Sequence, residues 1–249
     1  KAGYDRVETM ASLPTAKKPK EKTLLIDGNK SIALGAIHGG CRVYYAYPMS
    51  PASTILTHMS NFANESGVLV KQGEDEITVS NMTLGSMYMG TRAMCATSGG
   101  GFDLMTETLS LAGITETPMV VCIAQRPGPG TGLPTWTCQG DLNLAIYSSH
   151  GEFPKVVIGC SDPTDCFDLT QHAFNFAEKY QCVVVLLTEK TIAESLMTVP
   201  VFEQNKIPIE RGLVEGKELK ELENEDRFRI TKNGVSKRWV PGASKAYYF

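Results

Sequence analysis

Short apolar runs alternate with amphipathic stretches along most of this chain. The apolar runs predict strands at 42–47, 68–71, 92–97, 119–125, 155–159 and 183–187. Helices are predicted at 30–38, after Pro51 to about 64, from 74–76 onward, at 103–115, at 141–149, and from 162 to about 180. Strands that alternate with helices, several of them apolar throughout, indicate a parallel sheet with helices on both faces. The predicted fold class is therefore α/β.

The stretch 74–135 is organised around a βαβ unit. Strand 92–97 runs into a glycine-rich loop, and strand 119–125 runs into a loop rich in glycine and proline. Asp103 is expected to cap the intervening helix, with Leu104, Thr108 and Leu111 on one face. The two strands of a βαβ unit are parallel, so both loops leave from the carboxyl edge, where open α/β sheets bind ligands.

Composition limits the function classes. The 249 residues include 42% hydrophobic and 8% aromatic residues, which suits a packed core. A net charge of −3 gives no sign of nucleic-acid binding, and no apolar run is long enough to span a membrane. The seven cysteines occur singly, without C-x-x-C spacing, so we expect a reduced, cytoplasmic protein without a metal cluster of its own.

The elements are expected to form one domain at 23–195. Residues 1–22 are polar, and their composition is typical of a linker from a preceding domain that is missing here. From Pro200 the pattern dissolves into charged chain, so 196–249 is interpreted as a segment that connects to a missing C-terminal domain.

Four groups of residues each follow a predicted strand, and a parallel sheet would gather them at one edge: Ser50, Glu76, the turn Ser98-Gly99-Gly100-Gly101, and Arg126. Each has an alternative explanation. A glutamate in the first helical turn favours the helix dipole, and three glycines can form a tight turn. Arg126 lies in a rigid loop and offers a two-pronged donor that suits a carboxylate. No nucleotide-binding fingerprint is present, so the residues alone indicate an α/β domain that binds a small anion.

These loops resemble the motifs of 2-oxoacid:ferredoxin oxidoreductases, in the same order along 28 to about 190. The matching segments are Tyr47-Pro48-Met49-Ser50-Pro51-Ala52-Ser53, Glu74-Asp75-Glu76, Ala96-Thr97-Ser98-Gly99-Gly100-Gly101-Phe102, Gln125-Arg126, Thr131-Gly132-Leu133-Pro134-Thr135, Gln139-Gly140-Asp141-Leu142 and Ser149-His150-Gly151-Glu152. The resemblance is greatest to the alpha subunit of 2-oxoglutarate oxidoreductases. The segment that contains the glycines is also similar to the pyrimidine-binding domain of thiamine diphosphate enzymes in general.

The resemblance implies a role for each candidate residue. Glu76 matches the catalytic glutamate that hydrogen-bonds the aminopyrimidine ring of thiamine diphosphate, and Ser98 to Phe102 match the adjoining cofactor-binding turn. Arg126 matches the arginine that holds the 2-oxoacid carboxylate, with Ser50 and Thr135 lining the substrate pocket. Ser50 stands where the family usually has threonine, and Gly100 replaces the usual proline, so the turn is expected to be looser.

The family's Mg²⁺–diphosphate motif, G-D-G followed by asparagine, has no counterpart in this sequence. The resemblance implies a beta subunit that carries the diphosphate site, Mg²⁺ and a [4Fe-4S] cluster, with thiamine diphosphate shared between the subunits. Coenzyme A and ferredoxin are the further partners expected, in a homo- or hetero-oligomer.

The predicted function is oxidative decarboxylation of 2-oxoglutarate to its acyl-CoA, with the active site shared with the beta subunit. Pyruvate, branched-chain 2-oxoacids and indolepyruvate remain alternative substrates. A non-catalytic assembly domain and a plain anion-binding domain remain alternatives of other classes. Intact Glu76 and Arg126 argue against the assembly domain.

Overall fold

The computed structural model describes residues 3–8, 11–12, 14–15 and 21–247, so much of the predicted linker at 1–22 lies outside the described residues. Its centre is a six-stranded sheet of order β3-β2-β4-β5-β7-β6, in which every neighbouring pair is parallel. The strands are β2 (Val43–Ala46), β3 (Leu69–Gln72), β4 (Ala93–Thr97), β5 (Met119–Gln125), β6 (Lys155–Gly159) and β7 (Val183–Glu189). The predicted α/β class with a parallel sheet is confirmed.

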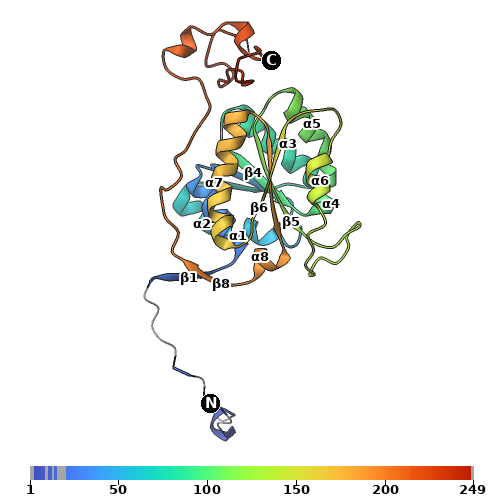
Figure 1. Cartoon of the computed structure of the whole chain (residues 1–249), viewed down its shortest axis with the longest axis vertical. Coiled ribbons are helices and arrows are strands. Elements are labelled where there is room, and N and C mark those ends of the chain that lie inside the picture. Colours follow the sequence, from blue (N-terminus) through green and yellow to red (C-terminus); the bar gives the residue numbers. More distant parts are fainter. Residues whose placement is uncertain (1–2, 9–10, 13, 16–20, 248–249) are drawn as a thin grey trace.

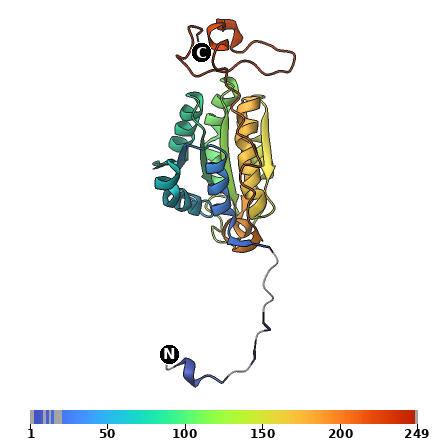
Figure 2. The ribbon, with the colours of Figure 1, turned by 90° about the vertical axis from the view of Figure 1, so that its left-hand side faces the viewer.

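Helices cover both faces of the sheet (Figure 1). One face carries α1 (Gly28–His38), α2 (Ser53–Ser66) and α7 (Pro163–Tyr180), and Figure 2 shows α1 in blue beside α7 in orange. The other face carries α3 (Glu76–Tyr88), α4 (Gly99–Leu104), α5 (Thr106–Ile114) and α6 (Leu142–Tyr147). Among the described residues, no helix combines the length and apolar content needed to cross a membrane.

The helix predicted at 103–115 is two helices, α4 and α5, which meet at Met105. Asp103 lies inside α4, so its prediction as the N-cap was wrong. The glycines of the turn are themselves helical, and Ser98 occupies the cap position instead. The predicted apolar face was also wrong, since Leu104 and Leu111 are 50% and 39% exposed. The side chains that pack against the sheet recur at helical spacing and are Phe102, Met105, Leu109 and Ala112.

A second, two-stranded sheet joins the two ends of the predicted domain. The run at 24–26 belongs to β1 (Thr23–Ile26), which pairs antiparallel with β8 (Met197–Pro200). Helix α8 (Lys190–Glu194) leads from β7 towards β8. Short 3₁₀ helices occupy Tyr4–Arg6, Glu218–Lys220 and Asn224–Asp226.

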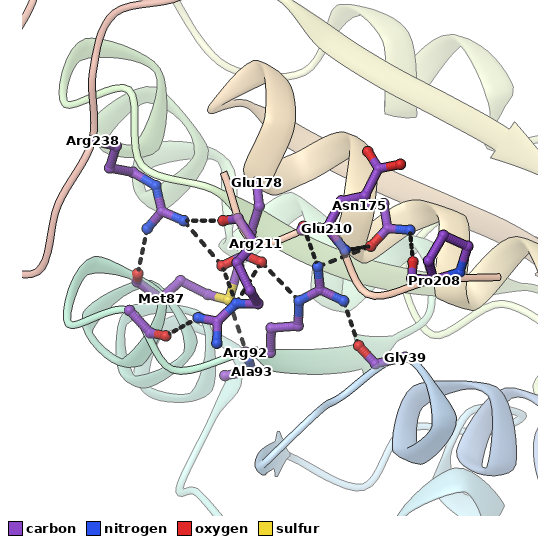
Figure 3. A network of polar contacts seen from close by, with 11 residues as sticks. Gly39, Met87, Arg92, Ala93, Asn175, Glu178, Pro208, Glu210, Arg211 and Arg238 are labelled. Atoms are coloured by element: carbon purple, nitrogen blue, oxygen red, sulfur yellow. Dashed lines mark hydrogen bonds and ion pairs between the residues drawn. The ribbon is translucent and has the colours of Figure 1, made fainter. Parts of the chain in front are cut away.

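Residues 201–247 return along the molecule and cover the amino ends of the strands (Figure 1). Glu178, near the end of α7, accepts hydrogen bonds from three arginines (Figure 3). Of these four side chains, only that of Arg211 is not fully buried. The donors are Arg92 Nε at 2.8 Å, Arg211 Nε at 2.9 Å and Arg238 Nη2 at 3.0 Å. Arg92 precedes β4, whereas the other two belong to the returning segment, so this Glu178 cluster fastens the segment to the domain.

Trp239 is buried in a small apolar cluster of the returning segment itself, with Leu222 and Ala246. Arg227 adds another contact by donating hydrogen bonds to Gln181 and to Glu116 at the amino edge. The interpretation of 196–249 as connecting chain stays a prediction, although these residues pack on the domain as they pass. The returning segment covers the amino edge of the sheet. A ligand site is therefore expected at the loops of the carboxyl edge.

Candidate active site

The four candidate groups follow four adjacent strands of the sheet. Ser50 follows β2, Glu76 follows β3, Ser98 follows β4 and Arg126 follows β5. The order β3-β2-β4-β5 makes these strands neighbours, and their parallel pairing brings all four groups to the carboxyl edge. The sequence-based expectation that these loops share one edge therefore agrees with the geometry.

Glu76 is the first residue of α3, but it is not the residue that caps the helix. The cap is Asp75, whose carboxylate accepts a hydrogen bond from the Thr78 N–H at 2.7 Å. That hydrogen bond lowers the pKa of Asp75 below its usual value. Glu76 is instead turned inward and is only 3% exposed. Glu76 still lies in the first turn, where the helix dipole favours it, but that interaction does not require burial and so does not explain its inward position.

The Glu76 carboxylate faces the glycine turn. Thr97, the last residue of β4, donates a hydrogen bond from its hydroxyl to Glu76 Oε1 at 3.5 Å. A Cβ on Gly101 would lie 2.5 Å from the same oxygen, which is inside van der Waals contact. The absence of a side chain at 101 is thus what lets the turn approach the carboxyl group.

Ser98 stands at the head of this turn and is fully buried. Its Oγ has no hydrogen-bond partner among the described residues. A buried hydroxyl without a partner is costly, so its presence beside Glu76 points to a ligand group at this place. Phe102, at the other end of the turn, is buried in the hydrophobic core on the face of the sheet that carries α4. Its packing anchors the glycine turn to that face.

Arg126 ends β5 and is 8% exposed. Its Nη1 donates a hydrogen bond to the carbonyl of Ser50 at 2.7 Å, which ties two of the candidate loops together. Asn29 holds the same loop from the other side, because its Nδ2 donates to the Pro51 carbonyl at 2.8 Å and to the Thr54 hydroxyl at 2.5 Å. Asn29 is a site-supporting residue that sequence reasoning missed; it lies just before the helix predicted at 30–38.

A cavity of about 130 Å³ opens beside Arg126. Its walls include Gly99 and Gly100 of the turn, Asp103 of α4, and Asp141. The turn therefore has two sides: Gly101 faces Glu76, while Gly99 and Gly100 face the cavity of Arg126. This places a buried carboxyl group and a guanidinium on either side of one glycine turn.

Two further positions differ from what sequence reasoning emphasised. Thr135 lies on the exposed loop between β5 and α6 and is not among the residues that line the cavity, so its role in the substrate pocket stays a prediction. Asp141 was noticed only within a motif, yet its carboxylate lies against Gly99. Burial, and then the neighbouring charge of Asp103, raise the pKa of Asp141.

The comparisons with known proteins agree with this geometry. The family model described as Pyruvate flavodoxin/ferredoxin oxidoreductase, thiamine diP-bdg, matches residues 34–238. The chain belongs to this family. The resemblance seen in the sequence motifs is thereby confirmed.

Curated relatives and a solved structure support the assignment to this family. The 2-oxoacid:ferredoxin oxidoreductase 1, subunit alpha, of Sulfurisphaera tokodaii is 40% identical over all of this chain and 41% of its own length. The 2-oxoglutarate synthase subunit KorA of Methanothermobacter thermautotrophicus is 37% identical over 75% of this chain and 50% of its own length. The chain thus spans about half or less of these relatives.

The solved structure is the 2-oxoglutarate:ferredoxin oxidoreductase from Magnetococcus marinus with 2-oxoglutarate, coenzyme A and succinyl-CoA bound. It is similar to this chain with a TM-score of 0.87 and 34% identity, over 97% of this chain and 42% of that one. The thiamine diphosphate-binding fold expected from the sequence is therefore confirmed.

The residues present fit one half of thiamine diphosphate. The unpartnered Ser98 hydroxyl, the glycine turn and the inward carboxyl of Glu76 suit a flat, polar ring such as the aminopyrimidine. The described residues therefore fit the pyrimidine end of the cofactor.

Proposed function

We propose that this chain is the pyrimidine-binding part of the alpha subunit of a 2-oxoacid:ferredoxin oxidoreductase, with 2-oxoglutarate as substrate. The observation that carries the proposal is the buried Glu76 carboxyl against the glycine turn, with Arg126 on the other side of that turn. The bound 2-oxoglutarate of the structurally similar enzyme supports the choice of substrate.

Thiamine diphosphate, when bound, would supply the electron sink that decarboxylation of a 2-oxoacid requires. The part of Glu76 is to hold and exchange a proton with the aminopyrimidine ring. A buried carboxyl group held in one position suits this task, because proton transfer needs a donor and an acceptor in fixed geometry. Thr97 and the glycine turn restrict the Glu76 side chain to one position.

Arg126 would bind the substrate carboxylate. Its Nη1 is committed to the Ser50 carbonyl, and this hydrogen bond orients the guanidinium plane. The remaining donors are available at the cavity wall, where a charge-assisted and partly buried hydrogen bond is stronger than one in water. Ser50 and Thr135 are proposed to complete the pocket when the partner is present.

The partner would be a beta subunit that brings the Mg²⁺–diphosphate site and a [4Fe-4S] cluster. Electrons released by oxidation of the substrate would leave through that cluster to ferredoxin, and coenzyme A would take the acyl group. The lack of the G-D-G…N motif in this sequence supports an active site shared between two subunits.

The test is to assemble the subunit that contains this chain with its beta subunit and to measure viologen reduction with coenzyme A. The panel of substrates is 2-oxoglutarate, pyruvate, branched-chain 2-oxoacids and indolepyruvate. We expect the highest kcat/KM with 2-oxoglutarate. Preference for another 2-oxoacid would correct the substrate, whereas reduction with none of them would favour an assembly domain and overturn the proposed reaction.

A further inference from the structure

Asp141 faces the same cavity as Arg126, in a position that no sequence motif assigns to substrate. Three charged residues line this cavity among the described part of the chain: Asp103 from α4, Arg126 from the end of β5, and Asp141 from the start of α6. An anionic substrate held by Arg126 would therefore meet Asp141 at close range. The protonation state of Asp141 then decides its effect on the substrate. An ionised carboxylate repels an anion, whereas the neutral acid can bind it.

The carboxylate of Asp141 is packed into the wall of the cavity. Its two oxygens would lie 2.6 and 2.8 Å from a Cβ on Gly99, so this approach requires a glycine at that position. Oδ2 is buried and has no hydrogen-bond partner among the described residues. An ionised carboxylate with one enclosed and unpartnered oxygen is costly, which favours the carboxylic acid; Oδ1, which is not enclosed in this way, is the oxygen that could donate to a ligand.

The backbone on both sides of Asp141 is fixed, so the carboxyl group is positioned before any ligand arrives. The Asp141 N–H donates to Gln125 Oε1 at 2.9 Å, and Gln125 Nε2 donates to the Thr188 carbonyl at 3.3 Å. The Asp141 carbonyl accepts from the Ala145 N–H at 2.9 Å inside α6. Asp141 is thus joined to the ends of β5 and β7 in a single arrangement, which limits the cost of ordering it on binding.

Burial, and then the negative charge of Asp103, act in the same direction on Asp141 and raise its pKa. The pKa in the free protein is raised overall. A substrate carboxylate would place another negative charge in the cavity and would favour the protonated form further, because two carboxylates close together share a proton.

We propose that Asp141 is a substrate-binding residue, which in its carboxylic acid form donates a hydrogen bond to the 2-oxoacid held by Arg126. The inference rests on the proposed function, since it takes a 2-oxoacid as the occupant of the cavity. Arg126 supplies a positive charge, and Asp141 supplies a neutral hydrogen-bond donor. The charge of Arg126 then cancels that of one substrate carboxylate. Binding above the pKa of free Asp141 then takes up a proton from solvent.

The experiment uses the assembled alpha–beta enzyme and compares wild type with Asp141→Asn and Asp141→Leu. We expect the wild-type kcat/KM to fall as pH rises through the pKa of Asp141, because the ionised form has no proton to donate and repels the substrate. Asp141→Asn keeps a donor of the same size and should retain the KM of the wild type at low pH while losing this pH-dependent fall. Below the pKa of Asp141, where the wild type carries the proton, Asp141→Leu should raise KM roughly tenfold or more, because a hydrogen bond to a charged group is lost.

A second measurement does not depend on turnover. Calorimetric binding of the 2-oxoacid in buffers of different ionisation enthalpy counts the protons taken up, and we expect uptake that increases with pH in wild type and none in Asp141→Asn. Asp103→Asn is the matched control, because removing that charge should lower the pKa of Asp141 and move the fall in kcat/KM to lower pH. Thermal melting should be unchanged in the two asparagine variants.

The results that would overturn the proposal are distinct from those that would overturn the proposed function. If Asp141→Asn binds the 2-oxoacid as weakly as Asp141→Leu, or if wild type takes up no proton at any pH, Asp141 does not donate to the substrate. If the wild-type complex binds the 2-oxoacid with proton uptake and yet oxidises none, the proposed reaction is wrong and the role of Asp141 in binding is supported.

Discussion

Gly101 and Glu76 lie so close together that a side chain at 101 has no space. A Cβ on Gly101 would lie 2.5 Å from Glu76 Oε1 and closer still to the Thr97 hydroxyl. Glu76 and Thr97 are both buried, so little space is open for either side chain to move aside. The glycine is therefore required for the observed position of the Glu76 carboxyl group.

Gly101→Ala is expected to displace Glu76 and to abolish most activity. Overpacking of a tight site costs about 1–3 kcal/mol, so the variant should fold with a lowered free energy of unfolding. Gly100→Ala is the matched control in the same turn, because a Cβ there would meet only the Gly130 carbonyl, at 3.4 Å. Activity and denaturant unfolding of both variants check this, and equal activity in the two would contradict the close approach at Gly101.

Glu76→Gln separates catalysis from folding. The amide keeps the size and a hydrogen-bonding carbonyl, so the free energy of unfolding should fall by only about a few tenths of a kcal/mol. It cannot exchange a proton with the aminopyrimidine, and acid–base steps of this kind contribute about 10²–10⁴-fold. We expect retained cofactor and a loss of roughly a hundredfold or more in 2-oxoacid oxidation and in exchange of the thiazolium C2 proton. Normal C2 exchange would show that another residue has this role.

Asp75→Asn is the neighbouring comparison, because Asp75 caps α3 while Glu76 faces the site. The Thr78 N–H lowers the pKa of Asp75 in the folded state. Its ionised form therefore stabilises the fold above the unfolded-state pKa, and this stabilisation is lost as pH falls through the lowered pKa. We expect Asp75→Asn to flatten the acid limb of a melting-temperature profile and to leave activity at neutral pH intact. An unchanged acid limb would mean that the cap does not contribute to stability.

The main elements could be predicted because their signals are local. Strand 119–125 and strand 155–159 are apolar runs whose ends coincide with those of β5 and β6. The helix start at Asp162 and Pro163 is also as predicted, since the cap and the first helical position are set by adjacent residues. The four loops at the carboxyl edge followed from parallel pairing alone.

Features that depend on distant residues were missed. Gly99 to Gly101 were expected to be a loop because glycine has a low helix propensity, yet contacts with Glu76 and Asp141 favour a helical turn there. Arg211 and Arg238 belong to a segment that is rich in charge and was interpreted as solvated connecting chain. Their partner, Glu178, precedes them by 33 and 60 positions, and no local pattern relates the three.

Glu178→Gln is expected to destabilise the fold without altering the site. The substitution leaves the buried Arg92 and Arg238 without their carboxylate, and breaking a buried pair of this kind costs about 3–5 kcal/mol. The cluster lies at the amino edge, so kcat/KM under conditions where the protein is folded should match wild type. Lys206→Gln is the control, because its pair with Asp168 is exposed and contributes little. The free energy of unfolding of both variants is the measurement, and equal values would contradict the assigned role of the cluster.

Cofactor binding is expected to depend on the partner. The described residues offer the aminopyrimidine a buried carboxyl group and an unpartnered hydroxyl, whereas the sequence has no G-D-G…N motif for the Mg²⁺–diphosphate. We expect calorimetry of the isolated subunit to detect weak or no binding of thiamine diphosphate, whether or not Mg²⁺ is present. Adding the beta subunit should produce tight, Mg²⁺-dependent binding. Tight Mg²⁺-dependent binding to the isolated subunit would refute the shared site.

Arg126 allows the substrate half of the site to be tested separately from the cofactor half. Its Nη1 holds the Ser50 carbonyl, and its other donors face the cavity, so Arg126→Ala removes both a loop contact and the proposed carboxylate contact. The loss of a hydrogen bond to a charged group is worth about 1.5–3 kcal/mol, which corresponds to a rise in the KM for the 2-oxoacid of roughly 10- to 150-fold.

The two contacts of Arg126 can be distinguished by Asn29→Ala, which loosens the Ser50 loop from its other side and leaves the guanidinium in place. If Arg126 acts only by holding the loop, both variants should raise KM equally. If it binds the carboxylate, Arg126→Ala should have much the larger effect, and Arg126→Lys should recover only part of it, because lysine lacks the planar fork. Thiamine diphosphate binding should be similar in all three variants, since Glu76 and Ser98 are untouched. A wild-type KM in Arg126→Ala would exclude the proposed role of the guanidinium in binding substrate.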